Sequence, residues 1–185
     1  MPAQHRRSPP AATLLLDACV ALNLAATGRP TDILATLTPQ FAMARQAAEE
    51  TLYIETVTAG IATQEVVNPR QWVAEGVLHI LELEAAETLQ FVTLAAEIDD
   101  GEAATLAIAR AGGHEVATDD RKARRVAQRL ELPEPIRTSR LLHDYCSAAN
   151  LSERDIAEVL HATEQHARFR PPTNDPLHPW WTKAL

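Results

Sequence analysis

The sequence is poor in aromatic residues and cysteines and has no long apolar run. Aromatic residues make up 4% of the 185 residues, so the core must be built from Leu, Ile, Val and Ala. The two cysteines, Cys19 and Cys146, cannot form a disulfide framework, and reduced thiols in a cytoplasmic protein are the simpler interpretation. No stretch reaches the ~20 apolar residues of a membrane span, so we expect no membrane partner.

The N-terminal segment resembles a secretion signal only at first sight. His5-Arg6-Arg7 precedes an apolar run, but Asp17 stands in the middle of that run, and a charge is costly in the apolar part of a signal. We therefore interpret residues 1–10 as a loose leader of a cytoplasmic protein.

Positive charge is scarce as well. The chain has 17 Lys and Arg against 25 Asp and Glu, a formal net charge of −8. This balance argues against a broad phosphate-binding surface, since clustered Lys and Arg usually provide one. The exception is a local basic run, which comprises Arg121, Lys122, Arg124, Arg125 and Arg129. The sequence therefore allows a small cationic rim.

Short apolar stretches alternate with amphipathic ones along the chain. We predict strands at 13–16, 41–44, 77–81, 114–118 and 136–138, and helices at 18–27, 32–37, 46–56, 84–98, 102–111, 121–130, 139–148 and 152–167. Residues 57–71 read as a loop or hairpin-like excursion, and 170–185 as an irregular tail. This order predicts an α/β fold, with a mostly parallel sheet covered on both faces, in one domain spanning 1–185.

Acidic residues recur at the expected carboxyl ends of strands and starts of helices. Asp17 closes the first strand, and Asp119 and Asp120 follow the strand at 114–118. Glu102 begins a helix after an Asp-Asp-Gly turn, and Glu50 lies on a helix after the second strand. Ligands of open α/β sheets bind beyond the carboxyl ends of the strands. We therefore expect these carboxylates to converge.

Converging carboxylates repel one another, and a hard divalent cation relieves that repulsion. Oxygen-only ligands suit Mg²⁺ or Mn²⁺ rather than zinc, and such an ion can activate water for phosphodiester hydrolysis. The sequence shows no cysteine–histidine cluster, no Gly-rich phosphate loop and no nucleophile-elbow serine. Metal-assisted hydrolysis is therefore the chemistry it favours.

Each acid also has a structural interpretation. Asp119 or Asp120 could cap the helix that begins at residue 121, and Glu102 suits the dipole of its helix. Of Glu49 and Glu50, only one can easily face a common pocket, because helical neighbours point about 100° apart. Asp17, which closes a Leu-Leu-Leu strand, is the acid whose position most favours a function.

Four segments together resemble the PIN-domain ribonucleases. They are Leu-Leu-Leu-Asp17-Ala-Cys-Val-Ala-Leu-Asn-Leu, Glu49-Glu50-Thr-Leu, Asp-Asp-Gly-Glu102-Ala-Ala-Thr-Leu-Ala-Ile-Ala and Val-Ala-Thr118-Asp119-Asp120-Arg-Lys-Ala-Arg-Arg-Val-Ala. The resemblance implies a three-layer α/β/α fold and a Mg²⁺- or Mn²⁺-dependent endoribonuclease. It further implies a toxin of a bacterial toxin–antitoxin pair, held silent by an antitoxin protein.

Carried over by position, the resemblance assigns catalysis and metal binding to Asp17, Glu50, Glu102 and Asp120, with Asp119 as the alternative to Asp120. Because they follow directly after Asp120, Arg121, Lys122, Arg124 and Arg125 are candidate contacts to an RNA backbone, with a solvated helix face as the equal alternative. A homodimer is compatible with the sequence.

One departure from the family pattern follows the first acid. Ala18 and Cys19 stand where a small polar residue often supports it, which weakens an expected supporting hydrogen bond. This departure favours the alternative of a catalytically silent PIN-like module that binds RNA or a partner protein. A metal-dependent phosphatase is a weaker alternative, because the halo-acid dehalogenase pattern has a second Asp where Cys19 stands.

Overall fold

A four-stranded parallel sheet forms the centre of the molecule. The computed structural model describes residues 13–50, 52–58 and 61–185, so the predicted leader at 1–10 lies outside the described residues. The strands are β1 (Thr13–Leu16), β2 (Gln40–Ala44), β5 (His79–Leu81) and β6 (Glu115–Ala117), in the order β5-β2-β1-β6. Every pairing is parallel, which confirms the predicted parallel sheet.

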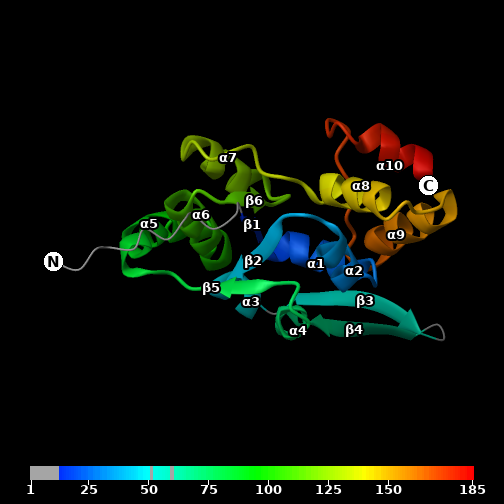
Figure 1. Ribbon diagram of the computed structural model, residues 1–185, viewed down its shortest axis with the longest axis horizontal. Helices are drawn as coiled ribbons and strands as arrows, with labels where there is room; N and C mark the ends of the chain where they lie inside the picture. Colours follow the sequence, from blue (N-terminus) through cyan, green and yellow to red (C-terminus); the bar gives the residue numbers. More distant parts are fainter. Residues whose placement is uncertain (1–12, 51, 59–60) are drawn as a thin grey trace.

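Helices cover both faces of this sheet (Figure 1). On one side, α6 (Asp100–Gly112) lies against β1, β2 and β6 and packs with α3 (Arg45–Glu49), α5 (Ala85–Ala95) and α7 (Arg121–Arg129). On the other side, α1 (Ala18–Ala26) packs with α2 (Pro30–Thr36), α8 (Thr138–Ala148) and α9 (Glu153–His166). The result is the predicted three-layer α/β/α arrangement.

The inner strand β1 explains the position of Asp17. Leu14, Leu15 and Leu16 of β1 are fully buried between the two helical layers. A strand covered on both faces has a continuous apolar run rather than alternation, and this run ends at Asp17. In residues 13–50, 52–58 and 61–185 we find no helix long and apolar enough for a membrane span.

The helix predicted at 46–56 was wrong in its second half. α3 ends at Glu49, and an antiparallel hairpin of β3 (Leu52–Thr58) and β4 (Ile61–Val67) follows. The segment is rich in β-branched and aromatic residues, which favour a strand once a partner strand is available. The hairpin-like excursion predicted at 57–71 is thus confirmed for β4, and α4 (Pro69–Ala74) follows it (Figure 1).

Two predictions near the C-terminus also need correction. The strand expected at 136–138 is a single bridge between Ile136 and Ala117, because α8 begins at Thr138. The tail is not irregular throughout, since α10 covers His178–Ala184. Its Trp181 is 0% exposed and donates a hydrogen bond from Nε1 to Glu164, so docking on α9 accounts for the helix.

Candidate active site

The carboxyl ends of β1 and β6 form the switch point of the sheet. The chain runs from β1 outward to β2 and β5, then returns to the opposite side of β1 as β6. In open α/β sheets, the crevice at such a reversal is where ligands bind. The two strand ends are also joined directly, because the amide of Asp17 donates a 3.0 Å hydrogen bond to the carbonyl of Ala117.

Asp17 lies at the centre of this edge and is 4% exposed. Its Oδ1 accepts from the amide of Ala18 (2.8 Å), which caps α1. Its Oδ2 accepts from the hydroxyl of Thr118 (2.8 Å) and the thiol of Cys19 (3.1 Å). Burial raises the pKa of Asp17, and the charge of Asp99 adds to this rise. The hydrogen bonds lower the pKa but do not outweigh burial, so the pKa is raised overall.

The hydrogen bond that we expected to be weakened after the first acid is present in the structure. The Cys19 thiol occupies the supporting position, although sulfur is a weaker donor than a hydroxyl. Burial and the neighbouring Asp17 charge raise the pKa of this thiol, so Cys19 stays a neutral donor. Thr118, from the end of β6, supplies the stronger hydrogen bond.

Glu102 reaches the same edge from the first turn of α6. Asp99 caps this helix by accepting a 3.1 Å hydrogen bond from the amide of Glu102. Burial raises the pKa of Glu102 to about 8, and the charges of Asp17, Asp99 and Asp120 add to the shift. Glu102 therefore lies within electrostatic reach of the acids that follow β1 and β6.

Glu50, at the end of α3, packs onto the start of α6. A Cβ at Gly101 would lie 1.9 Å from Oε1 of Glu50, so only glycine permits this approach. Burial raises the pKa of Glu50 to about 7, and the charges of Asp99, Asp17 and Asp100 raise it further. This carboxyl therefore belongs to the same acidic group.

Glu49 differs from its neighbour in the partners it has. Its carboxylate forms ion pairs with Arg45 (3.5 Å) and Arg70 (3.2 Å) on the surface. Of the two adjacent glutamates, Glu50 is the one whose pKa the other acids raise. The structure thus separates two residues that the sequence could not.

Asp119 and Asp120 are separated in the same way. Asp119 is enclosed: it accepts from the hydroxyl (2.5 Å) and amide (3.2 Å) of Thr138 and from Nδ2 of Asn23 (3.1 Å). Burial raises the pKa of Asp119, and these hydrogen bonds and Arg137 lower it. Asp119 thus fastens α8 to α1. Asp120 caps α7, and its charge raises the pKa of Glu102.

Asp99 is an acid that sequence reasoning missed. Its charge contributes to the raised pKa values of Asp17, Glu50 and Glu102. The sequence held a usable signal, because Asp is a favoured N-cap residue and Asp99 stands directly before α6, three residues before Glu102. A cavity of about 590 Å³ opens beside this acid, lined by Gln46, Glu49, Glu50, Ala95, Ile98, Asp99, Asp100 and Gly101.

The donor chemistry of this edge fits a hard divalent cation. Each candidate ligand offers carboxylate oxygens, which Mg²⁺ and Mn²⁺ prefer. Burial raises the pKa values of Glu50 and Glu102, and the neighbouring negative charges raise them further. Among the residues that the structure describes, however, no three His, Cys, Asp or Glu side chains are arranged to hold a metal ion. The acids share an electrostatic environment without forming a closed ligand set.

An open parallel sheet with buried acids at its switch point defines a class of α/β/α proteins suited to phosphodiester chemistry. A family model described as a PIN domain matches residues 14–171, most of the chain, and the chain belongs to this family. Membership indicates a nuclease-type function. No curated protein and no solved structure shows a significant match to the chain.

Proposed function

We propose that this protein is a divalent-metal-dependent endoribonuclease whose active site is the acidic edge around Asp17. The observation that carries the proposal is the placement of a buried Asp17 at the switch point, within electrostatic reach of Glu50 and Glu102. Isolated surface acids would not raise each other's pKa values in this way. The PIN-domain family membership supports the same nuclease chemistry.

The residues that would hold Mg²⁺ or Mn²⁺ are Asp17, Glu50, Glu102 and Asp120. When bound, the ion supplies an activated water and stabilises the departing oxyanion. Asp17 is the central ligand, because Thr118 and Cys19 both donate hydrogen bonds to its Oδ2 and so hold its carboxylate in place. Hydrogen bonds of this kind, donated to a ligand by its neighbours, orient the ligand before the cation arrives.

Asp119 acts in this proposal as a positioning residue rather than as a ligand. Its oxygens accept hydrogen bonds from Thr138 and Asn23, which hold the turn that presents Asp120. Glu50 and Glu102, with raised pKa values of about 7 and about 8, must lose protons when the cation binds. Proton release is thus a part of the binding step.

The test is RNA cleavage by the purified protein in Mg²⁺ or Mn²⁺, with Asp17→Asn and Asp32→Asn compared side by side. Asp32, in the first turn of α2, lies away from the acidic edge and gives a matched charge change. We expect wild type and Asp32→Asn to cut RNA and Asp17→Asn to be inactive. Equal traces of cleavage in all three would indicate a contaminating nuclease and overturn the proposal.

The biological role that fits this activity is that of a toxin restrained by an antitoxin protein. The support is the resemblance of the four acidic segments to toxin-like PIN-domain ribonucleases. Expression of wild type alone should stop growth, and expression of Asp17→Asn should not. Growth arrest by both variants would dissociate the effect from the proposed active site.

A further inference from the structure

The basic helix α7 begins directly after Asp120. Its buried residues are Ala123, Val126 and Ala127, and they fix which side of the helix packs on the protein. Arg121, Lys122, Arg125 and Arg129 are exposed on the remaining surface, and Arg121 follows directly after Asp120. In a chain with a net charge of −8, this concentration of positive charge needs an explanation beyond solubility.

The structure divides these cations by the partners that they have. The Arg124 side chain is 13% exposed, pairs with Glu134 and donates to the carbonyls of Pro135 (2.8 Å) and Thr118 (3.4 Å). Arg129 pairs with Glu97 (2.6 Å). These two arginines are occupied in holding the fold, although Arg124 was among the predicted RNA contacts.

Arg121 and Arg125 differ from them. Both are exposed, and within the described residues neither side chain forms an ion pair or hydrogen bond. They lie four residues apart on α7, which places them on one face, one turn from each other. Together they line a hollow of about 520 Å³ whose other walls are Arg124, Gln128 and Glu134.

The chemistry of this hollow suits a phosphodiester. A guanidinium presents a planar fork of donors that matches phosphate oxygens, and two forks one turn apart can follow a chain of phosphates. The hollow begins one residue beyond Asp120, so a strand whose scissile bond lies at the acids must place its flanking phosphates nearby. Acidic surroundings also restrict anion binding to this patch.

We propose that Arg121 and Arg125 form a phosphate subsite that binds the backbone of a single RNA strand beside the scissile bond. The inference rests on the proposed ribonuclease function and adds to it the residues that hold the substrate. Arg121 lies nearer to the acids and Arg125 one helical turn farther along α7. Arg124 shapes the wall of the subsite through its pair with Glu134 and does not bind the strand.

The experiment measures binding of a fluorescein-labelled 12-nucleotide RNA, in EDTA and over a series of KCl concentrations. All variants carry Asp17→Asn, so that cleavage does not interfere. We expect R121A/R125A to bind about tenfold more weakly at moderate salt and to reduce the slope of log K against log [salt] by about 1.4, since each phosphate contact to a single strand contributes about 0.7.

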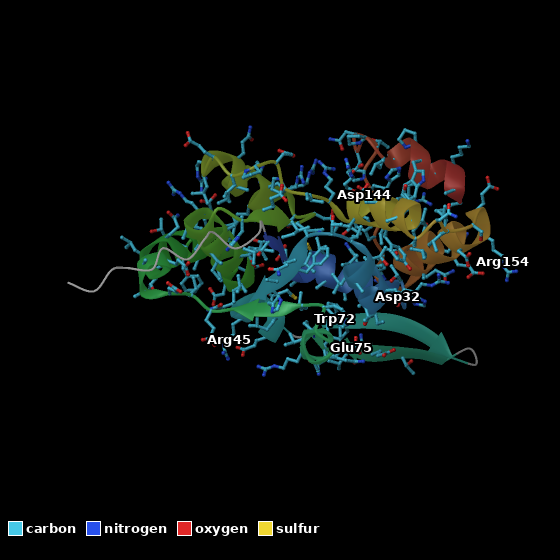
Figure 2. All side chains as sticks on the ribbon, in the orientation of Figure 1. Asp32, Arg45, Trp72, Glu75, Asp144 and Arg154 are labelled. Carbon is cyan, nitrogen blue, oxygen red and sulfur yellow. The ribbon has the colours of Figure 1, made fainter. Side chains whose placement is uncertain are left out.

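The matched control is R140A/R154A, which removes the same charge from α8 and α9. Arg154 lies at the far end of the molecule from α7 (Figures 1 and 2). We expect this control to keep most of the affinity and the slope. R121K/R125K, which retains the charge but not the guanidinium fork, should restore the slope and only part of the affinity.

The outcomes separate this subsite from the ribonuclease proposal. If R121A/R125A and R140A/R154A show the same slope, or if no variant binds the RNA, the subsite is overturned. If these two variants show the same slope but wild type cuts RNA, the ribonuclease proposal stands and the subsite fails. If R121A/R125A loses binding but wild type never cuts RNA in Mn²⁺, the subsite stands and the enzyme proposal fails.

Discussion

The hydroxyl of Thr118 donates a 2.8 Å hydrogen bond to Oδ2 of Asp17, across the adjacent ends of β6 and β1. The two residues are 101 positions apart in the chain. The contact makes the orientation of the central acid depend on the parallel pairing of two strands. Thr118 thus donates, from a distant segment, the hydrogen bond that a hydroxyl next to Asp17 in the sequence would otherwise donate.

Removal of this hydroxyl should impair cleavage more than folding. We expect Thr118→Val to lower the RNA cleavage rate about 10- to 100-fold, the usual effect of losing support to a metal ligand. Its cost in unfolding free energy should be about 1–3 kcal/mol, because a buried acceptor loses one donor. Cleavage assays and urea unfolding measure both quantities. Thr118→Ser, which keeps the hydroxyl, should retain activity, and its inactivation would contradict the assigned role.

Gly101 gives a way to move Glu50 without touching its charge. Gly101→Ala places a methyl group where Oε1 of Glu50 lies, so that carboxyl must turn away from the start of α6. Alanine favours a helix over glycine, but its Cβ would also lie 3.1 Å from the backbone Cα of Ala47. We therefore expect cleavage to fall more than stability.

Gly112→Ala, at the other end of α6, is the matched control for this substitution. Its methyl group meets only the side chain of His114, and we expect full activity. Equal activity of both alanine variants would exclude Glu50 from the reaction.

Without metal, the stability of the protein should fall as the pH rises from about 5 to 8. The folded-state pKa values of Glu50 and Glu102, about 7 and about 8, lie above the ordinary value of 4.5. Between these limits the folded state binds more protons than the unfolded state, so unfolding becomes easier with increasing pH. Melting temperatures in EDTA test this, and the decline should be smaller in Glu102→Gln. An equal decline in that variant would refute the shift at Glu102.

Binding of Mn²⁺ should release protons and stabilise the fold. The cation must displace protons from acids whose pKa values lie near or above neutrality. Titration calorimetry at pH 7, in two buffers of different ionisation enthalpy, should therefore give different apparent heats. The melting temperature should rise with Mn²⁺ in wild type and not in Asp17→Asn. Equal responses of the two proteins would favour the catalytically silent module.

The C-terminal helix should contribute strongly to stability. Trp181 is fully buried, and its indole N–H donates to Glu164. We expect Trp181→Ala to lower the unfolding free energy by about 3–5 kcal/mol, the usual cost of deleting a large buried side chain. Trp180→Ala, in a partly exposed neighbour, should cost less. Urea unfolding measures both, and similar small losses would show that the docking of α10 is loose.

Several predictions from sequence depended on local patterns and hold in the structure. The short apolar run Leu14–Leu16, which lacks alternation and ends at Asp17, predicts a buried strand, and the structure has β1 there. The end of α6 was also predictable from the sequence, because Gly112-Gly113 is a typical end of a helix. In the structure Gly113 has a positive φ of 66°, which favours glycine. The first strand of the hairpin, β3, was predicted as helix because strand propensity needs a partner strand to be realised.

The sequence by itself determined the parallel sheet, most of the helices that cover it and the acid that closes β1, because each of these is recorded in the spacing of neighbouring residues. Only the tertiary structure decided which of two adjacent acids faces the others. Glu49 is held by Arg45 and Arg70, Asp119 by Thr138 and Asn23, and Arg124 by Glu134. Except for Arg45, which lies one helical turn before Glu49, these partners lie ten or more positions away in the chain, so local spacing does not reveal them.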